Sequence, residues 1–322
     1  MKNKIFLTRT LHDFALKELR KRYQIEIHSG KIPIPKTKLR SKIKEIDGLI
    51  CFPYDKIEKE TMDCAENLKV ISTYSVGFDH IDTEYAKEKK IRVGYTPEVL
   101  TDATADLAFS LLLDVSRRVS EGDRIIRDGK WKEIYGAYDY VGVDLQGKTI
   151  GILGLGRIGS TLAKRAKAFD MKIIYHSRKR VSKNREKALG AKYVSFDKLV
   201  SQSDFISIHV PHTKETDQLF DMKVFKKMKK TSFLINTSRG KVINEKDLVA
   251  ALKKKVISGA GLDVFEVEPI NKKHPFVKLP NIVLAPHIGS STKETRSKMA
   301  EITVKNLDLG MKGKKPIYSV GY

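Results

Sequence analysis

One glycine-rich stretch constrains the fold of this chain more than any other feature, because Gly154, Gly156 and Gly159 stand in a G-x-G-x-x-G pattern. The apolar run at residues 149–153 predicts a strand directly before it, and residues 157–169 predict a helix directly after it. In that context the first glycine permits a tight turn, the second lets the backbone approach a pyrophosphate, and the third lets helix and strand pack closely. The stretch therefore predicts a dinucleotide-binding loop of the Rossmann type, with cofactor contacts expected at Gly154, Leu155, Gly156, Arg157, Ile158 and Gly159.

Short apolar strands alternate with helices along the whole chain, which predicts parallel sheets covered by helices on both faces. Before residue 100, strands are expected at 4–7, 47–51, 69–73 and 91–94, and helices at 10–21, 56–66 and 82–89. One long helix is then expected at 101–127. Later strands are expected at 148–153, 172–175, 205–209, 233–236, 259–264 and 282–285, and later helices at 157–169, 196–201, 223–229, 245–253 and 292–306.

The length of 322 residues exceeds what one core usually serves, so two domains are expected. We expect the last helix, at residues 292–306, to pack on the strands that precede residue 100. We therefore expect two doubly wound α/β domains. Residues 1–98 and 288–322 would form a discontinuous, flavodoxin-like substrate domain, and residues 99–287 would form an inserted Rossmann domain.

The charge balance is strongly basic, with 62 Lys and Arg against 39 Asp and Glu and a net charge of +23. These cations are scattered along expected helices and loops and accompany no nucleic-acid-binding motif, so we expect no specific nucleic-acid partner. A positive field of this kind would also attract anionic substrates and cofactors.

Several kinds of site and location are disfavoured by the sequence. No apolar run is long enough to span a bilayer, so we expect no membrane partner. The start of the chain predicts a strand rather than a signal peptide, and Cys51 and Cys64 have no disulfide or metal spacing. No His, Cys and Asp cluster has metal-ligand spacing either. A cytoplasmic protein without a bound metal is expected.

The end of the second strand of the Rossmann domain bears on the choice of cofactor. NAD sites usually place an acidic residue there to bind the ribose 2′-hydroxyl. Here Ser177 and Arg178 are followed by Lys179 and Arg180, and the first acid is Glu186. Such residues are suited to a 2′-phosphate, so NADP(H) is the expected cofactor and NAD(H) remains possible. Three solvated basic side chains are the alternative interpretation.

Three polar residues follow expected strands of the same domain: Arg239, Glu268 and His287. Each alone could be an ordinary surface or core residue. The carboxyl ends of parallel strands form one edge of a sheet, where α/β proteins bind their ligands. The shared placement therefore makes the three a candidate catalytic group.

The motifs that contain these residues resemble a known family, the D-isomer-specific 2-hydroxyacid dehydrogenases. The resemblance runs through nearly the whole chain and is carried by residues 154–159, 236–240, 263–269 and 286–290. Residues 75–82 and 92–104 are especially similar to the glyoxylate/hydroxypyruvate reductase branch. The Ser177–Arg178 pair also resembles the NADP-using members.

The resemblance implies reduction of a small 2-oxo acid by hydride transfer from NAD(P)H. It implies that His287 donates the proton to the carbonyl oxygen, that Glu268 orients the imidazole, and that Arg239 binds the carboxylate and the carbonyl oxygen. The amides of Val76 and Gly77 are implied as a second carboxylate clamp. Further cofactor contacts are implied at Thr104, Val210, Pro211, Thr237 and Asp263.

The resemblance also implies a homodimer, in which the aromatic segment 131–143 would take part. The loop that carries Phe52 and Tyr54 is expected to border the substrate pocket. Phosphoglycerate- and lactate-type dehydrogenases are alternatives within the family. A dinucleotide-sensing, corepressor-like regulator is the alternative from another functional class.

Overall fold

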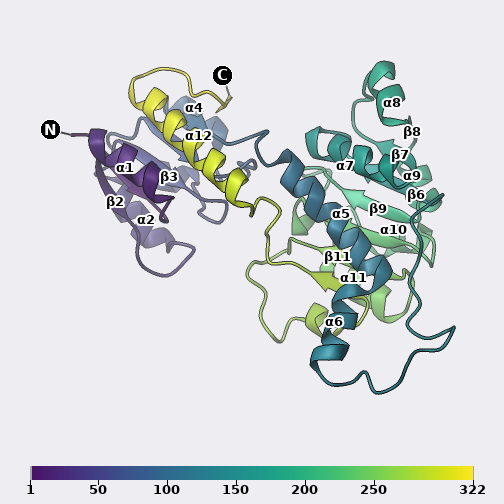
Figure 1. The fold of residues 1–322 in the computed structure, drawn as a ribbon. Coiled ribbons are helices and arrows are strands. Elements are labelled where there is room, and N and C mark those ends of the chain that lie inside the picture. The colour runs from purple at the N-terminus through teal and green to yellow at the C-terminus, as the bar shows by residue number, and fades with distance from the viewer. Residues whose placement is uncertain (1, 322) are drawn as a thin grey trace. The chain divides into compact units, whose positions relative to one another are not determined.

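The computed structural model describes residues 2–321, which divide into two compact units (Figure 1). The central unit is Thr101–Gly289. The terminal unit is formed by the two ends of the chain, up to Leu100 and from Ser290. The domain boundaries expected from the sequence, after residues 98 and 287, each lie two residues before the observed boundary.

A six-stranded sheet forms the middle of the terminal unit. Its strand order is β13-β5-β4-β3-β1-β2, and all neighbours are parallel except β13, which runs antiparallel to β5. The order of the five parallel strands is that of flavodoxin, which confirms the predicted fold class for this unit. The strands are β1 (Lys4–Leu7), β2 (Gln24–Ile27), β3 (Gly48–Cys51), β4 (Val70–Thr73), β5 (Arg92–Gly94) and β13 (Ser319–Val320).

The C-terminal helix α12 (Lys293–Met311) packs on β3, β4, β5 and α1 of this unit. Its close approach depends on a residue without a side chain, because a Cβ at Gly310 would lie 2.3 Å from Cγ2 of Val70. The Ser72 hydroxyl donates to the carbonyl of Thr303 over 2.8 Å at the same contact. The other helices are α1 (Asp13–Arg22), α2 (Lys36–Ile43), α3 (Lys59–Met62) and α4 (Thr83–Glu88).

A seven-stranded, fully parallel sheet forms the middle of the central unit, in the order β12-β11-β10-β9-β6-β7-β8. This is the Rossmann order with one further strand, and the chain reverses direction across the sheet between β6 and β9. The predicted Rossmann fold is therefore confirmed. The strands are β6 (Thr149–Leu153), β7 (Lys172–His176), β8 (Ala191–Tyr193), β9 (Phe205–Ile208), β10 (Phe233–Asn236), β11 (Gly259–Leu262) and β12 (Ile282–Leu284).

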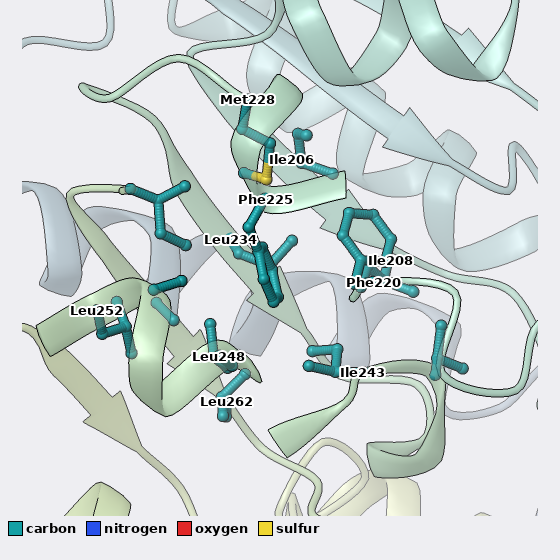
Figure 2. Packing of buried hydrophobic residues seen from close by; sticks show 14 of the residues in the cluster. Ile206, Ile208, Phe220, Phe225, Met228, Leu234, Ile243, Leu248, Leu252 and Leu262 are labelled. Carbon is teal, nitrogen blue, oxygen red and sulfur yellow. The ribbon is translucent and has the colours of Figure 1, made fainter. Parts of the chain in front are cut away.

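Helices cover both faces of this sheet, with a hydrophobic core on each side. One core is built from Phe220, Phe225 and their neighbours, which Figure 2 shows packed against the strand residues Ile206 and Leu234. The other lies between the strands and helices α5 and α7. The helices are α5 (Thr101–Arg117), α6 (Val119–Arg127), α7 (Arg157–Ala168), α8 (Lys183–Leu189), α9 (Phe196–Gln202), α10 (Met222–Lys227) and α11 (Glu245–Lys253), with 3-10 turns η1 (Gly240–Val242) and η2 (Pro275–Lys278).

The prediction of one helix over residues 101–127 was wrong. The chain breaks between α5 and α6 at Arg118, whose φ of 58° is left-handed. Its guanidinium pairs with Glu121 and lies 4.0 Å from the centroid of the Tyr140 ring. These contacts hold a conformation that costs energy for a residue with a Cβ.

Five short strands and α-helices were not predicted: the edge strands β2, β8 and β13 and the helices α2 and α8. β2 is only partly buried along its length, so it lacks the apolar run that marks a central strand. Among residues 2–321 no helix has the length and apolar character needed to cross a membrane.

Candidate active site

The glycine loop follows β6 at the reversal point of the central sheet. A Cβ at Gly159 would lie 2.1 Å from the carbonyl oxygen of Gly154, so the third glycine is required for the helix to pack here. Gly154 itself has a left-handed φ of 94°. Gly156 has open space where a side chain would project, which leaves its backbone accessible to a ligand. The loop thus has the shape of a phosphate-binding turn at the start of α7.

The loop after β7 adjoins the glycine loop, because the amide of Leu155 donates to the Ser177 hydroxyl over 2.9 Å. Arg178 and Lys179 are exposed there. Arg180 instead forms a two-point ion pair with Glu186, with Nε–Oε1 and Nη2–Oε2 distances of 2.8 and 2.7 Å. The structure therefore gives Arg180 a partner within the protein, which the sequence did not reveal.

Glu186 lies at the centre of a small hydrogen-bond network, in which it accepts from Arg180. It also accepts a hydrogen bond from the Tyr175 hydroxyl over 2.6 Å, and that hydroxyl accepts the amide of Val181. Arg180 first and Tyr175 second lower the pKa of Glu186 to about 2. Burial, followed by the hydrogen bond to Glu186, raises the pKa of Tyr175 to about 12. The network links Arg180 and Val181 of the loop after β7 to Tyr175 on β7 and to Glu186 on α8.

His287 and Glu268 come together in the loops that follow β12 and β11. The distance from Nδ1 of His287 to Oε2 of Glu268 is 2.7 Å. The other carboxylate oxygen of Glu268 accepts the amide of Phe265 over 2.9 Å. Because Nδ1 faces the carboxylate, Glu268 fixes the orientation of the imidazole ring. This is the geometry of an oriented general acid.

Asp263 holds the turn that carries His287. Its two oxygens accept the amides of Ile288 and Gly289 over 2.7 and 2.9 Å, and Thr104 donates to the carbonyl of Gly289 over 3.2 Å. Burial raises the pKa of Asp263, and the two amides oppose this shift. His287 has a left-handed φ of 55°, so the turn needs such support.

Arg239 follows β10 in a loop fixed by Asn236. The Asn236 side chain accepts from the amide of Ser238 over 2.9 Å and donates to the carbonyl of Arg239 over 2.9 Å. A Cβ at Gly240 would lie 1.9 Å from the carbonyl carbon of Phe265, so this loop lies directly against the loop after β11. The loops that carry Arg239 and Glu268 are therefore adjacent.

Other predicted cofactor residues lie at the same edge of the central sheet. Thr237 follows β10 and is buried, and its hydroxyl has no hydrogen-bond partner within residues 2–321. Val210 and Pro211 follow β9, where the Thr216 hydroxyl donates to the carbonyl of Pro211 over 2.8 Å. An unpartnered hydroxyl at this edge fits a site for a polar ligand.

Val76 and Gly77 lie in the terminal unit, in the loop after β4. The Ser75 hydroxyl donates to the carbonyl of Gly77 over 2.6 Å and contacts the Thr73 hydroxyl at 2.7 Å. The amides of Val76 and Gly77 donate to no acceptor in the described part of the chain. Two adjacent unbound amides are suited to donate hydrogen bonds to a carboxylate.

Two residues of the site were missed from the sequence. Asn236 anchors the Arg239 loop, and Arg185 on α8 donates to the Ser160 hydroxyl over 2.7 Å and to the carbonyl of Gly156 over 3.3 Å. The only sequence signal for Arg185 was a further cation shortly after the basic run at 178–180. Within residues 2–321 no group of three His, Cys, Asp or Glu side chains could hold a metal ion.

Known proteins resemble this chain over its full length. Residues 109–289 match the family model for the NAD binding domain of the D-isomer specific 2-hydroxyacid dehydrogenases. The chain is 49% identical to a glyoxylate reductase of Thermococcus litoralis, over 98% of this chain and 96% of the relative. It is 46% identical to a glyoxylate reductase of Thermofilum pendens, over 97% and 93% of the two chains.

Solved structures agree with these relatives. A glyoxylate reductase from Paecilomyes thermophila has a TM-score of 0.88 and 30% identity, covering 99% of this chain and 98% of its own. An NADPH-dependent glyoxylate/hydroxypyruvate reductase from Sinorhizobium meliloti, in complex with NADP and malonate, has a TM-score of 0.87 and 28% identity, with coverage of 100% and 97%. This chain is therefore an oxidoreductase that belongs to the D-isomer specific 2-hydroxyacid dehydrogenase family.

Proposed function

We propose that the protein reduces glyoxylate and hydroxypyruvate to the corresponding D-2-hydroxy acids, with the central unit binding the nicotinamide dinucleotide. The observation that carries this proposal is the 2.7 Å contact between His287 and Glu268, in loops at the carboxyl edge of the central sheet. Relatives and solved neighbours named as glyoxylate or hydroxypyruvate reductases support the choice of substrate.

The central unit supplies the proposed acid and the proposed electrostatic clamp. His287 gives a proton from Nε2 to the carbonyl oxygen of the 2-oxo acid, and Glu268 stabilises the imidazolium and fixes its tautomer. Arg239 binds the carboxylate and the carbonyl oxygen through its planar guanidinium. A bound reduced nicotinamide supplies the hydride. Thr104, Thr237 and Asp263 shape the nicotinamide site, and Asp263 also fixes the turn of His287.

The terminal unit supplies the second carboxylate clamp in this proposal. The unbound amides of Val76 and Gly77 would donate hydrogen bonds to the substrate carboxylate. Tyr54 and Phe52 lie in the loop after β3, and the guanidinium of Arg9 packs 5.3 and 5.4 Å from the centroids of their rings. This packing restrains a loop that would limit the size of the substrate side chain.

NADP(H) is the proposed cofactor, with NAD(H) as the weaker substrate. Arg178 and Lys179 are exposed beside Ser177, and residues 176–180 contain no acidic side chain that could bind a ribose 2′-hydroxyl. The glycine loop residues from Gly154 to Gly159 would bind the pyrophosphate, and Val210 and Pro211 would border the adenosine.

A homodimer is the proposed assembly. Segment 131–143 exposes much apolar surface, and the side chains of Ile134 and Tyr138 are both 93% exposed. A hollow of about 310 Å³ lies at the edge of the central sheet opposite the catalytic loops. It is bordered by the amino ends of β10 and β12, by α5 and by residues 141–143 of this segment. Apolar exposure on this scale typically marks a protein interface. We also propose a cytoplasmic location, in line with the free thiols of Cys51 and Cys64.

Steady-state oxidation of the reduced nicotinamide tests the proposal. Glyoxylate, hydroxypyruvate, pyruvate and phosphohydroxypyruvate should each be combined with NADPH and with NADH. We expect the highest kcat/KM for NADPH with one of the first two acids. Turnover only with pyruvate or phosphohydroxypyruvate would indicate a lactate- or phosphoglycerate-type enzyme. Cofactor binding without any turnover would indicate a regulator.

A further inference from the structure

Arg185, which was not predicted to bind the cofactor, contacts the glycine loop. Arg185, in the first turn of α8, donates from Nη2 to the Ser160 hydroxyl over 2.7 Å and to the carbonyl of Gly156 over 3.3 Å. Its Nε and Nη1 groups donate to no protein acceptor among residues 2–321. Arg185 is therefore held beside the second glycine with donors still available for a ligand.

The contact to the Gly156 carbonyl places this guanidinium beside the glycine loop, at a part of a Rossmann site that is close to the adenosine ribose of a bound dinucleotide. In a Rossmann site the ribose next to the adenine lies between the second glycine and the end of the second strand. Here Ser177 at the end of β7 contacts the amide of Leu155, and the space over Gly156 is open. Arg185 borders that space from α8.

Arg180 is less available than its place in the sequence suggests. Both ends of its guanidinium fork are engaged by Glu186, so its charge offsets the only acid among residues 177–187. Without Arg180, the Glu186 carboxylate would repel a phosphate bound nearby. Arg178 and Lys179 are exposed in the loop after β7, and Arg185 contacts the glycine loop.

We propose that Arg185 is a direct ligand of the 2′-phosphate of NADP(H), together with Arg178, and that Arg180 is a positioning residue that neutralises Glu186. This inference rests on the proposed NADP(H) preference. It assigns the discrimination between the two cofactors to two elements, the loop after β7 and the first turn of α8.

The first test compares the variants Arg185→Gln and Arg185→Lys with wild type. Because a charge-assisted hydrogen bond contributes about 1.5–3 kcal/mol, Arg185→Gln should raise KM for NADPH about 10- to 100-fold. KM for NADH should change less than about threefold, and Arg185→Lys should recover part of the loss. Lys187→Gln, an exposed neighbour on α8, is the matched control and should behave as wild type.

Binding of fragments adds a readout that does not depend on catalysis. Adenosine 2′,5′-bisphosphate and adenosine 5′-monophosphate should be titrated by calorimetry into each protein. Arg185→Gln should weaken only the bisphosphate. Equal loss of both fragments, or of NADPH and NADH alike, would mean that Arg185 merely joins α8 to α7, and would overturn the inference. A wild-type enzyme without NADPH preference would instead reject the proposed cofactor.

The role of Arg180 has its own test. Arg180→Gln should weaken NADPH binding, because Glu186 then carries an unpaired charge. The double variant Arg180→Gln/Glu186→Gln should restore most of the affinity if Arg180 acts through Glu186. Failure of the double variant to recover NADPH binding, in a protein that keeps its NADH affinity, would make Arg180 a direct ligand and contradict the assignment.

Discussion

The carboxylate of Glu268 contacts Nδ1 of His287 through one oxygen and the amide of Phe265 through the other. The carboxylate is thus held from two sides and cannot rotate away from the ring without losing a hydrogen bond. Glu268 is fixed by the amide of Phe265 and in turn fixes the orientation of the His287 imidazole. Such support positions a general acid for proton transfer.

Removal of the imidazole should abolish most of the chemistry and leave cofactor binding intact. His287→Ala is expected to lower kcat by about 10²- to 10⁴-fold, because general acid catalysis contributes on that scale. The Kd for NADPH, measured by fluorescence titration, should stay within about twofold. Glu268→Gln keeps the ring and should cost less. Turnover of His287→Ala close to that of wild type would exclude His287 as the acid.

Two glycines of the fingerprint should respond differently to the same added methyl group. Gly159→Ala forces a Cβ to 2.1 Å from the carbonyl oxygen of Gly154, so it should lower the melting temperature by several degrees. Gly156→Ala meets no atom within 4 Å, so its melting temperature should match wild type. Its NADPH affinity should nevertheless fall at least about tenfold, because the methyl group occupies the approach of the pyrophosphate. Unchanged NADPH affinity would mean that the dinucleotide lies elsewhere.

His209, at the end of β9, should make the protein less stable in mild acid. Burial of its ring lowers the pKa of His209 from 6.5 to about 4, and its Nε2 contacts the Ser207 hydroxyl at 2.8 Å. Because the unfolded chain binds the proton first, this stability is present above pH 6.5 and is lost as the pH falls towards 4. The loss is at most about 3.5 kcal/mol, since one pKa unit corresponds to about 1.4 kcal/mol.

The measurement is the melting temperature of wild type and His209→Gln from neutral pH down to pH 4. The variant should be less stable at neutral pH, and its curve should decline less steeply through that window. Parallel curves would show that His209 does not titrate in this way.

The aromatic segment should control assembly. Ile134→Asp combined with Tyr138→Asp places two charges on side chains that are 93% exposed in the single chain, so neither should disturb its fold. Light scattering after size exclusion should give a dimer for wild type and a monomer for this variant at micromolar concentration. Phe14→Asp, on the exposed side of α1, is the control and should remain dimeric. A monomeric wild type would contradict the proposed assembly.

The sequence predicted the middle of each unit well because the signals there are local. The strand before the glycine loop, the helix after it and the bounds of β10 and α11 follow from apolar patterns within a few residues. The placement of Arg239 and His287 at one edge also follows, since parallel strands share a direction. What could be predicted was thus the scaffold and the side of the sheet that carries the chemistry.

Other features depend on contacts between distant residues and left no local pattern. The break at Arg118 is held by Tyr140, which lies 22 residues further on. The pairing of Arg180 with Glu186 depends on the path of the loop after β7. β2 alternates the polar Gln24 and the charged Glu26 with its two isoleucines, and charged side chains are common on edge strands.

The position of α12 at the end of the chain sets an order of events during synthesis. Its face against β3, β4 and β5 is made of residues 293–311, which leave the ribosome after the whole of the central unit. All strands and helices of the central unit are therefore synthesised while one face of the sheet in the terminal unit is not yet covered by α12. The apolar side chains on the face of the terminal sheet that α12 covers therefore stay exposed until residues 293–311 have emerged.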